Sequence, residues 1–172
     1  ATTVSSDEKA AFVRELGADL VINYKKENVS EALLAWTDQQ GVDIALDTVG
    51  GDAFKQLVPA IRLYGDLVTL LQIPEGVDWK ALRIKNVRVS QTLMLTPMLE
   101  GLDDLGGHHA AILEQCAQFF DERKLSVYVD DTLPLADVQQ AHQRIELGSQ
   151  SGKIVLQMHL DEMPVEDKAE DN

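Results

Sequence analysis

Two hydroxyl side chains, a lysine and a tyrosine follow the first two strand-like runs of the chain. Ser5 and Ser6 come directly after the first run, Lys9 lies one helical turn later, and Tyr24 comes directly after the second run. Hydroxyl groups and the free amides at the start of a helix bind phosphate oxygens, and an ammonium group adds a positive charge to such a site. If the two runs are neighbouring strands, these four side chains could hold one phosphate group.

The end of the first run also bears on which nucleotide could bind. Units that bind NAD place Asp or Glu at the tip of this strand, where the carboxylate accepts hydrogen bonds from the adenosine ribose. No carboxylate ends the run 1–4, which favours NADP over NAD as cofactor. A plainer interpretation stays open, because Asp7 and Glu8 suit the first turn of a helix and would repel a phosphate. In that case Ser6 is a helix cap and Tyr24 a surface aromatic residue.

Strand-like and helical segments alternate along the chain and must position these residues. A helix is predicted over 6–16, with Ser6 as its N-cap and Gly17 as its stop. Further elements are predicted as helices over 29–37, 52–63 and 110–122 and as strands over 20–23, 42–47, 67–71 and 87–93. Strands that are almost continuously apolar, with helices between them, predict an α/β fold with a parallel sheet covered on both faces.

The order of these elements predicts an incomplete nucleotide-binding unit. The run 1–4 and the helix after it correspond to the second strand and second helix of a Rossmann sheet. The first strand of such a sheet, and the Gly-x-Gly-x-x-Gly turn that holds the pyrophosphate, would come before Ala1. We therefore expect a Rossmann-type sheet with its first strand absent.

The sequence changes character after Lys124. A more polar strand is predicted over 127–132, followed by a break at Pro134, a helix over 136–147 and a strand over 153–159. The segment 161–172 then carries six carboxylates against one lysine. Such a composition predicts a solvated, disordered tail.

Composition excludes several classes of protein. With 172 residues, 45% of them hydrophobic, the chain can bury one sizeable core or one domain with an appendage. A formal net charge of −14 argues against a nucleic-acid partner. The sequence contains no run of eighteen apolar residues, so no membrane span is predicted. The single cysteine, Cys116, is typical of the reducing cytosol, so a cytoplasmic location and a buried, apolar role for this thiol are expected.

The histidines give little support for a metal site. His108 and His109 are the only paired histidines, and no cluster of cysteines accompanies them. A zinc site needs three or four ligands at suitable spacing, so no metal ligand is assigned. His142, on a predicted helix, is expected to cap or pack rather than to transfer protons.

Several segments, taken together and in order, resemble the medium-chain dehydrogenase/reductase superfamily. The similarity extends from residue 1 to about residue 158 and is greatest to the quinone oxidoreductase-like and zinc-type alcohol dehydrogenase-like branches. The matching segments are SSDEK at 5–9, ELGAD at 15–19, VINY at 21–24, GVD at 41–43, LDTVGG at 46–51 and GKIVL at 152–156, with Ala141, His142, Glu146 and Gly148 before the last of them.

The resemblance implies a division into parts of two domains. In that superfamily the cofactor domain is inserted into a GroES-like catalytic domain, so residues 1–124 would be the partial dinucleotide-binding domain. Residues 125–160 would be the C-terminal segment of the catalytic domain, and its N-terminal part would precede the chain. In members that contain zinc, the ligands lie almost entirely in that N-terminal part.

The resemblance also implies roles for individual residues. Relatives use a lysine and a tyrosine matching Lys9 and Tyr24 to hold the 2′-phosphate of NADP, and Ser5 and Ser6 agree with that use. The positions implied near the nicotinamide half are Thr48 and Val49 at the ribose, Leu71 with Gln72 and Ile73 after the fifth strand, Leu93 with Met94 and Leu95 by the ring, and Lys153 facing the cofactor cleft.

Three of these implied contacts stay open. Relatives often have glycine or serine where Leu71 to Ile73 stand, which leaves that backbone contact open. Leu93 could equally be sheet core, and Lys153 could be a solvated lysine at the end of a strand.

The function implied by the resemblance is that of an NADP-dependent oxidoreductase. The reaction would be hydride transfer between NADPH and a small carbonyl, quinone or enone, and the group that protonates the substrate would lie outside this chain. A homodimer is implied through the edge strand Val87–Leu93. Two other interpretations remain. The chain could be a non-catalytic, truncated Rossmann module for dimerisation or partner binding, although the absent strand would then leave backbone groups unpaired. It could also be a piece of a longer enzyme, and this interpretation is favoured.

Overall fold

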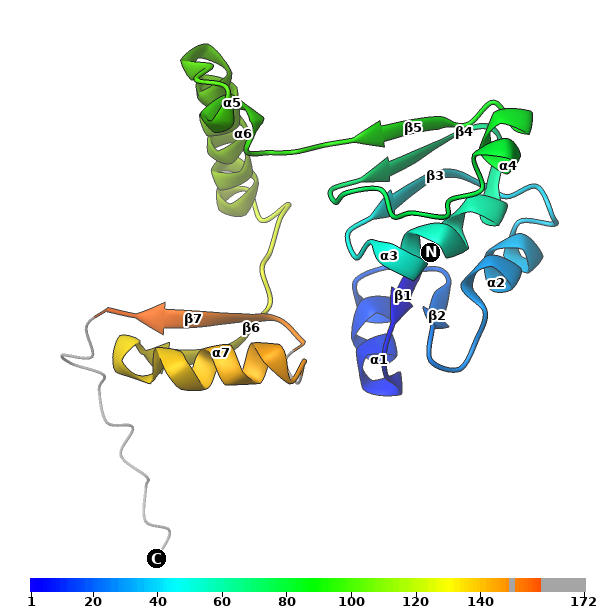
Figure 1. Cartoon of the computed structure of the whole chain (residues 1–172). Coiled ribbons are helices and arrows are strands. Elements are labelled where there is room, and N and C mark those ends of the chain that lie inside the picture. Colours follow the sequence, from blue (N-terminus) through cyan, green and yellow to red (C-terminus); the bar gives the residue numbers. More distant parts are fainter. Residues whose placement is uncertain (149–150, 159–172) are drawn as a thin grey trace, which may run out of the picture. The chain divides into compact units, whose positions relative to one another are not determined.

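The computed structural model describes residues 1–148 and 151–158, and the predicted acidic tail at 161–172 lies outside them. The chain divides into two compact units, Ala1–Ala110 and Ala111–Asn172 (Figure 1). The domain boundary predicted after Lys124 is a different division of the chain and stays a prediction. No helix of the described residues is both long enough and apolar enough to cross a membrane.

The first unit begins with a small parallel sheet. Strand β1 (Thr2–Val4) pairs with strand β2 (Val21–Asn23), and helix α1 (Asp7–Glu15) connects them. Both predicted ends of that helix are confirmed. The side chain of Ser6 accepts a hydrogen bond from the Lys9 amide, and Gly17 takes a φ of +97°.

A second parallel sheet follows in the same unit. Helix α2 (Val29–Trp36) leads to a three-stranded sheet in the order β3 (Val42–Asp47), β4 (Ile61–Thr69), β5 (Arg88–Gln91). The predicted α/β class and its parallel strands are confirmed. Within the described residues no strand joins β1 to β3. Two separate sheets are what a Rossmann unit without its first, central strand would give.

The predicted helix over 52–63 is wrong at its end. Helix α3 (Gly51–Leu57) stops early, a 3₁₀ turn η1 (Val58–Ala60) follows, and β4 already begins at Ile61. Proline at position 59 has no amide hydrogen to continue a helical ladder. Strand β4 therefore begins earlier than the predicted run 67–71 and ends at Thr69, and Gly65 lies inside it.

A bulge explains how a glycine fits within β4. Val42 pairs with Ile61 and Ile44 pairs with Asp66, so β4 has extra residues between two neighbouring pairs. A Cβ atom on Gly65 would lie 2.6 Å from the Ile61 side chain and 2.9 Å from the carbonyl oxygen of Asp43. Only glycine tolerates this approach between the strands.

Other boundaries also differ from the sequence-based expectation. Two short helices were not predicted, α4 (Trp79–Ile84) and α5 (Thr96–Leu99). Strand β5 ends at Gln91, which leaves Leu93 beyond the strand. Helix α6 (Asp103–Asp121) begins earlier than the predicted residue 110, and Cys116 on it is half-buried rather than buried.

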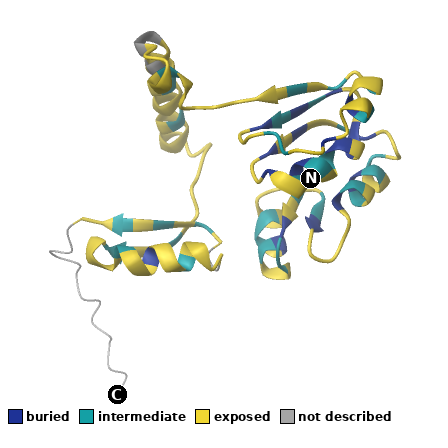
Figure 2. Ribbon diagram, in the orientation of Figure 1, coloured by how far each residue is buried: buried dark blue, intermediate teal, exposed yellow. Residues whose placement is uncertain are grey.

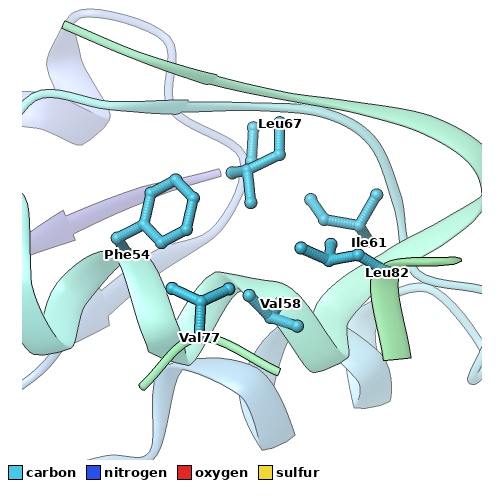
Figure 3. Close-up of a cluster of buried hydrophobic side chains, with 7 residues drawn as sticks. Phe54, Val58, Ile61, Leu67, Val77 and Leu82 are labelled. Carbon is cyan, nitrogen blue, oxygen red and sulfur yellow. The ribbon is translucent and has the colours of Figure 1, made fainter. Parts of the chain in front are cut away.

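Two hydrophobic clusters form the core of the first unit. The larger lies against the three-stranded sheet and centres on Phe54, which is fully buried (Figure 3). The smaller lies beside β2 and contains Ile22, Val29, Leu33 and Ala60. Val42 and Leu57 pack against both clusters. The two sheets of this unit thus share a continuous apolar core although no hydrogen-bonded ladder joins them.

The second unit has little core of its own. Strand β6 (Val129–Pro134) pairs in parallel with strand β7 (Lys153–Gln157), and η2 (Leu135–Asp137) and α7 (Val138–Glu146) lie between them in sequence. Among its described residues only Ala141 is buried (Figure 2). Arg144 of α7 forms ion pairs with Asp130 and Asp131 of β6, which ties the helix to the strand.

Candidate functional site

The first two strands bring the predicted phosphate-binding residues to one edge. The Tyr24 amide donates a hydrogen bond to the Val4 carbonyl oxygen at 3.1 Å, so the chain after β2 lies beside the chain after β1. Ser5 and Ser6 follow Val4 directly, and the Lys9 amide lies 3.3 Å from the Ser6 hydroxyl oxygen. The Tyr24 side chain is 52% exposed. The structure therefore places all four residues around the carboxyl ends of β1 and β2.

A polar network that sequence reasoning missed occupies the same edge. The ammonium group of Lys26 contacts both carboxylate oxygens of Asp7, at 2.9 and 2.7 Å. The side-chain amide of Asn23, which is buried, donates to Asp7 at 3.2 Å. The hydrogen bond from Lys26, and then the one from Asn23, lower the pKa of Asp7 from its ordinary value. Nothing local in the sequence predicted the Asp7–Lys26 contact, because nineteen residues separate the pair.

The network changes what Asp7 does at this edge. From the sequence its carboxylate was an argument against phosphate binding, because two anions repel. In the structure Lys26 balances that charge at a distance of 2.7 Å. The edge therefore presents hydroxyl groups and cations, one of which is paired with Asp7, and also the Glu27 carboxylate, which accepts from the Asn23 backbone amide at 3.3 Å.

A second polar network, which is buried, shapes the tips of β3 and β4. Asp47 is 3% exposed and Thr69 is fully buried, and the two residues pair across the strands. The Thr69 hydroxyl donates to the Asp47 carboxylate at 2.8 Å. The other carboxylate oxygen accepts from the amides of Val49 and Gly50, at 3.1 and 2.9 Å. The Leu71 amide donates to the Thr69 hydroxyl oxygen at 3.0 Å.

The turns after β3 and β4 touch each other. Gly50 has a φ of +77°, and a Cβ atom there would lie 3.0 Å from the Leu71 side chain. Val49 is 71% exposed, Leu71 is 42% exposed, and Thr48 is exposed too. The structure thus brings three of the predicted nicotinamide-side residues, Thr48, Val49 and Leu71, to one place.

Leu93 lies past the end of the neighbouring strand. The Thr92 amide donates to the Thr69 carbonyl oxygen at 2.9 Å, which keeps this segment beside the tip of β4. Leu93 itself is 54% exposed. The alternative that Leu93 belongs to the sheet core is therefore wrong, and its place by the nicotinamide ring stays a prediction.

Two other candidates lie in the second unit. Lys153 is exposed at the start of β7, where its amide donates to the Tyr128 carbonyl oxygen at 2.9 Å. Its predicted approach to a cofactor stays a prediction. His142 is exposed on α7.

The described residues do not assemble a metal centre. Over 1–148 and 151–158 no three or more side chains of His, Cys, Asp and Glu come together as a ligand set. His108 and His109 on α6 have ring centroids 6.5 Å apart. A tetrahedral zinc site does not fit these side chains.

The arrangement suits a ligand that spans two strand tips. In open parallel α/β sheets, ligands bind outside the carboxyl ends of the strands. Here one tip offers hydroxyl groups, a tyrosine and cations after β1 and β2. The other, after β3 and β4, offers turns of fixed shape with exposed apolar side chains.

Comparison with known proteins gives a consistent result. The model of the zinc-binding dehydrogenase family matches residues 16–156. Prostaglandin reductase-3 of Mus musculus is 30% identical over 172 residues, covering 91% of this chain and 44% of that protein. A quinone oxidoreductase-like protein 2 homolog of Nematostella vectensis is 26% identical, covering 88% and 42%. The chain spans less than half the length of these relatives.

Solved structures share the fold. An alcohol dehydrogenase superfamily protein from Novosphingobium aromaticivorans superposes with a TM-score of 0.79 at 23% identity, covering 91% of this chain and 47% of that one. A quinone oxidoreductase from Pseudomonas syringae pv. Tomato superposes with a TM-score of 0.72 at 25% identity, covering 90% and 47%.

Proposed function

The chain belongs to the zinc-binding dehydrogenase family, within the medium-chain dehydrogenase/reductase superfamily, and from this premise we propose that it forms the cofactor-binding part of an NADP-dependent oxidoreductase. The reaction is hydride transfer between NADPH and a small carbonyl, quinone or enone. A quinone oxidoreductase and a prostaglandin reductase among the relatives support this class of substrate.

One observation supports NADP in particular. Ser5, Ser6, Lys9 and Tyr24 lie around the carboxyl ends of β1 and β2, and the nearby Asp7 is paired with Lys26. A free carboxylate at this place would accept the ribose hydroxyls of NAD. A neutralised one, beside hydroxyl groups and amines, favours the extra phosphate of NADP.

Each tip has its own task in this proposal. Ser5, Ser6, Lys9 and Tyr24 bind the adenosine end, while Thr48 and Val49 orient the nicotinamide ribose. The exposed side chains of Leu71 and Leu93 line the ring and exclude water from it. When bound, NADPH supplies the hydride.

Zinc has no place among the described residues. The family's name refers to zinc, yet the described residues form no set of three metal ligands. No step of the proposed reaction is therefore assigned to a metal held by this chain.

We also propose that the chain pairs with a second copy through β5. This strand pairs only with β4 among the described residues, so its outer edge offers amides and carbonyl groups to a partner strand. Sedimentation equilibrium tests the pairing, and a monomer at every concentration contradicts it.

A cytoplasmic location is proposed from the single cysteine.

Nucleotide titration of the chain tests the cofactor proposal. We expect NADPH to bind with a dissociation constant on the order of micromolar and NADH to bind about tenfold more weakly, the effect of one charged hydrogen bond. Nicotinamide fluorescence reports both. Lys9→Ala and Tyr24→Phe should each reduce the preference for NADPH.

Two exposed residues away from the proposed site supply matched controls. Lys80→Ala on α4 and Tyr64→Phe on β4 remove the same groups elsewhere and should leave both affinities unchanged. Equal binding of NADPH and NADH would contradict the choice of NADP. Binding of neither, together with a stable dimer, would favour the alternative of a non-catalytic dimerisation module.

A further inference from the structure

The hydrogen bonds between Asp47 and Thr69 extend beyond the sheet to the turns on either side. One carboxylate oxygen of Asp47 accepts from the amides of Val49 and Gly50, and the other accepts from the Thr69 hydroxyl. That hydroxyl in turn accepts from the Leu71 amide. A continuous chain of hydrogen bonds therefore runs from the turn after β3 to the turn after β4. We call this pair of side chains the Asp47–Thr69 clamp.

Packing alone does not account for a carboxylate at this place. Asp47 and Thr69 are 3% and 0% exposed, so both polar side chains have lost their contact with water. Burying a carboxylate is costly unless donors replace the water, and an apolar pair of similar shape would fill the same space without that cost. What the apolar pair would lack is acceptors for the amides of the two turns. What distinguishes the clamp from an apolar pair is therefore that it accepts hydrogen bonds from those amides and holds them in place.

The clamp also sets how the turns meet. Gly50 stands so close to Leu71 that a Cβ atom would lie 3.0 Å from the leucine side chain. Fixing the Gly50 amide on Asp47 and the Leu71 amide on Thr69 holds both sides of this contact. A shift of either turn would break a buried hydrogen bond, which is expensive in a low-dielectric interior.

We propose that Asp47 and Thr69 are positioning residues for the nicotinamide half of the cofactor site. The proposal rests on the proposed function. A dinucleotide lies across two mononucleotide-binding halves of such a sheet, and β3, β4 and β5 belong to the second half. The exposed Thr48, Val49 and Leu71 are carried by the turns that the clamp fixes. The adenosine end lies at β1 and β2 and makes no use of the clamp.

The test compares a whole dinucleotide with its adenosine end. Calorimetry measures binding of NADPH and of adenosine 2′,5′-bisphosphate to the chain. We expect Thr69→Val, which keeps the shape and removes the hydroxyl, to weaken NADPH binding about tenfold, the loss of one hydrogen bond to a charged group. Binding of the bisphosphate should stay unchanged. Thr69→Ser keeps the hydroxyl and should retain most of the affinity for NADPH.

Amide hydrogen exchange supplies a readout without ligand. Val49 and Gly50 bond to Asp47 and not to Thr69. If the clamp couples the turns, both amides exchange faster in Thr69→Val than in Thr69→Ser, while amides in the middle of β4 stay protected. Thr69→Ala, which also removes the hydroxyl, is a second variant should Thr69→Val fold poorly, and it should show the same pattern in exchange and binding.

The outcomes separate the clamp from the proposed function. Equal weakening of NADPH and bisphosphate, or no weakening of either, overturns the clamp as a positioning device and leaves cofactor binding intact. A wild-type chain that binds neither nucleotide overturns the proposed function, and the clamp's role in it, together. Selective loss of NADPH binding with faster exchange at both turns supports the proposal.

Discussion

The two ends of the candidate site are held by different kinds of polar contact. After β1 and β2, Lys26 and Asp7 form an exposed ion pair on the surface. After β3 and β4, Asp47 and Thr69 form a buried network that reaches the backbone of both turns. Exposed ion pairs are screened by salt and can exchange partners with a ligand, whereas buried networks are rigid. The adenosine end is therefore built to adapt to a charged group, and the other end is built to keep its shape.

The hydrophobic clusters beneath the two ends of the site differ in size. The three-stranded sheet lies on the larger cluster around Phe54, and the two-stranded sheet lies on the smaller cluster around Ile22. The rigid end of the site thus has the larger apolar support. Val42 and Leu57 contact both clusters, so disturbance of one should reach the other.

The largest effect is expected from the larger cluster. Phe54→Ala removes a fully buried ring and should lower the free energy of unfolding by about 3–5 kcal/mol. Urea denaturation followed by circular dichroism measures the loss. Phe119→Ala on α6, where the ring is exposed, is the matched control and should change the free energy by no more than about 0.5 kcal/mol. Equal losses in both variants would refute the assignment of the main core.

Gly41→Ala should have the next largest effect, because it disturbs the junction of the two clusters. Gly41 has a φ of +85°, and a Cβ atom would lie 2.6 Å from the Ala60 carbonyl oxygen. Left-handed strain and backbone displacement together should cost at least about 2 kcal/mol. Gly17→Ala introduces the same left-handed strain, at a φ of +97°, but its Cβ atom would have no neighbour within 4 Å. A loss of about 1 kcal/mol in the free energy of unfolding is therefore expected there. Denaturant midpoints compare the two, and a larger loss at Gly17 would disprove the close approach.

Local sequence signals predicted the ends of several elements but not the contacts between them. Ser6 and Gly17 were predicted as cap and stop because both roles depend on neighbours within a few residues. The end of α3 was missed although Pro59 is a local signal against a continuing helix. That Ile61 then joins the core as a strand is decided by tertiary packing. Thr69 was missed as a partner of Asp47 because the two are brought together only by the register of β3 on β4. Such pairings follow from the folded sheet and have no local signal.

A smaller substitution tests whether the two sheets unfold together. Ile22→Val removes one buried methylene group from the smaller cluster and should cost about 0.5–1.5 kcal/mol. Because Val42 and Leu57 connect the clusters, native-state hydrogen exchange should show the same loss of protection at Ile22 and at Leu67. Faster exchange confined to β1 and β2 would show instead that the adenosine end opens independently.

The smallest effect concerns the exposed ion pair at the adenosine end and its response to acid. Hydrogen bonds from Lys26 and Asn23 lower the pKa of Asp7 from the ordinary 3.8. The stabilisation from this lowered pKa is present above the ordinary value and is lost as the pH falls through the lower, folded value. Lys26→Ala should raise the pKa of Asp7 back toward 3.8, as carboxyl NMR titration can measure. Lys80→Ala, which removes another exposed lysine, on α4, should leave the pKa of Asp7 unchanged. An unaltered pKa of Asp7 in Lys26→Ala would mean that the contact does not persist in solution, and that Asp7 is free to repel a phosphate at the adenosine end.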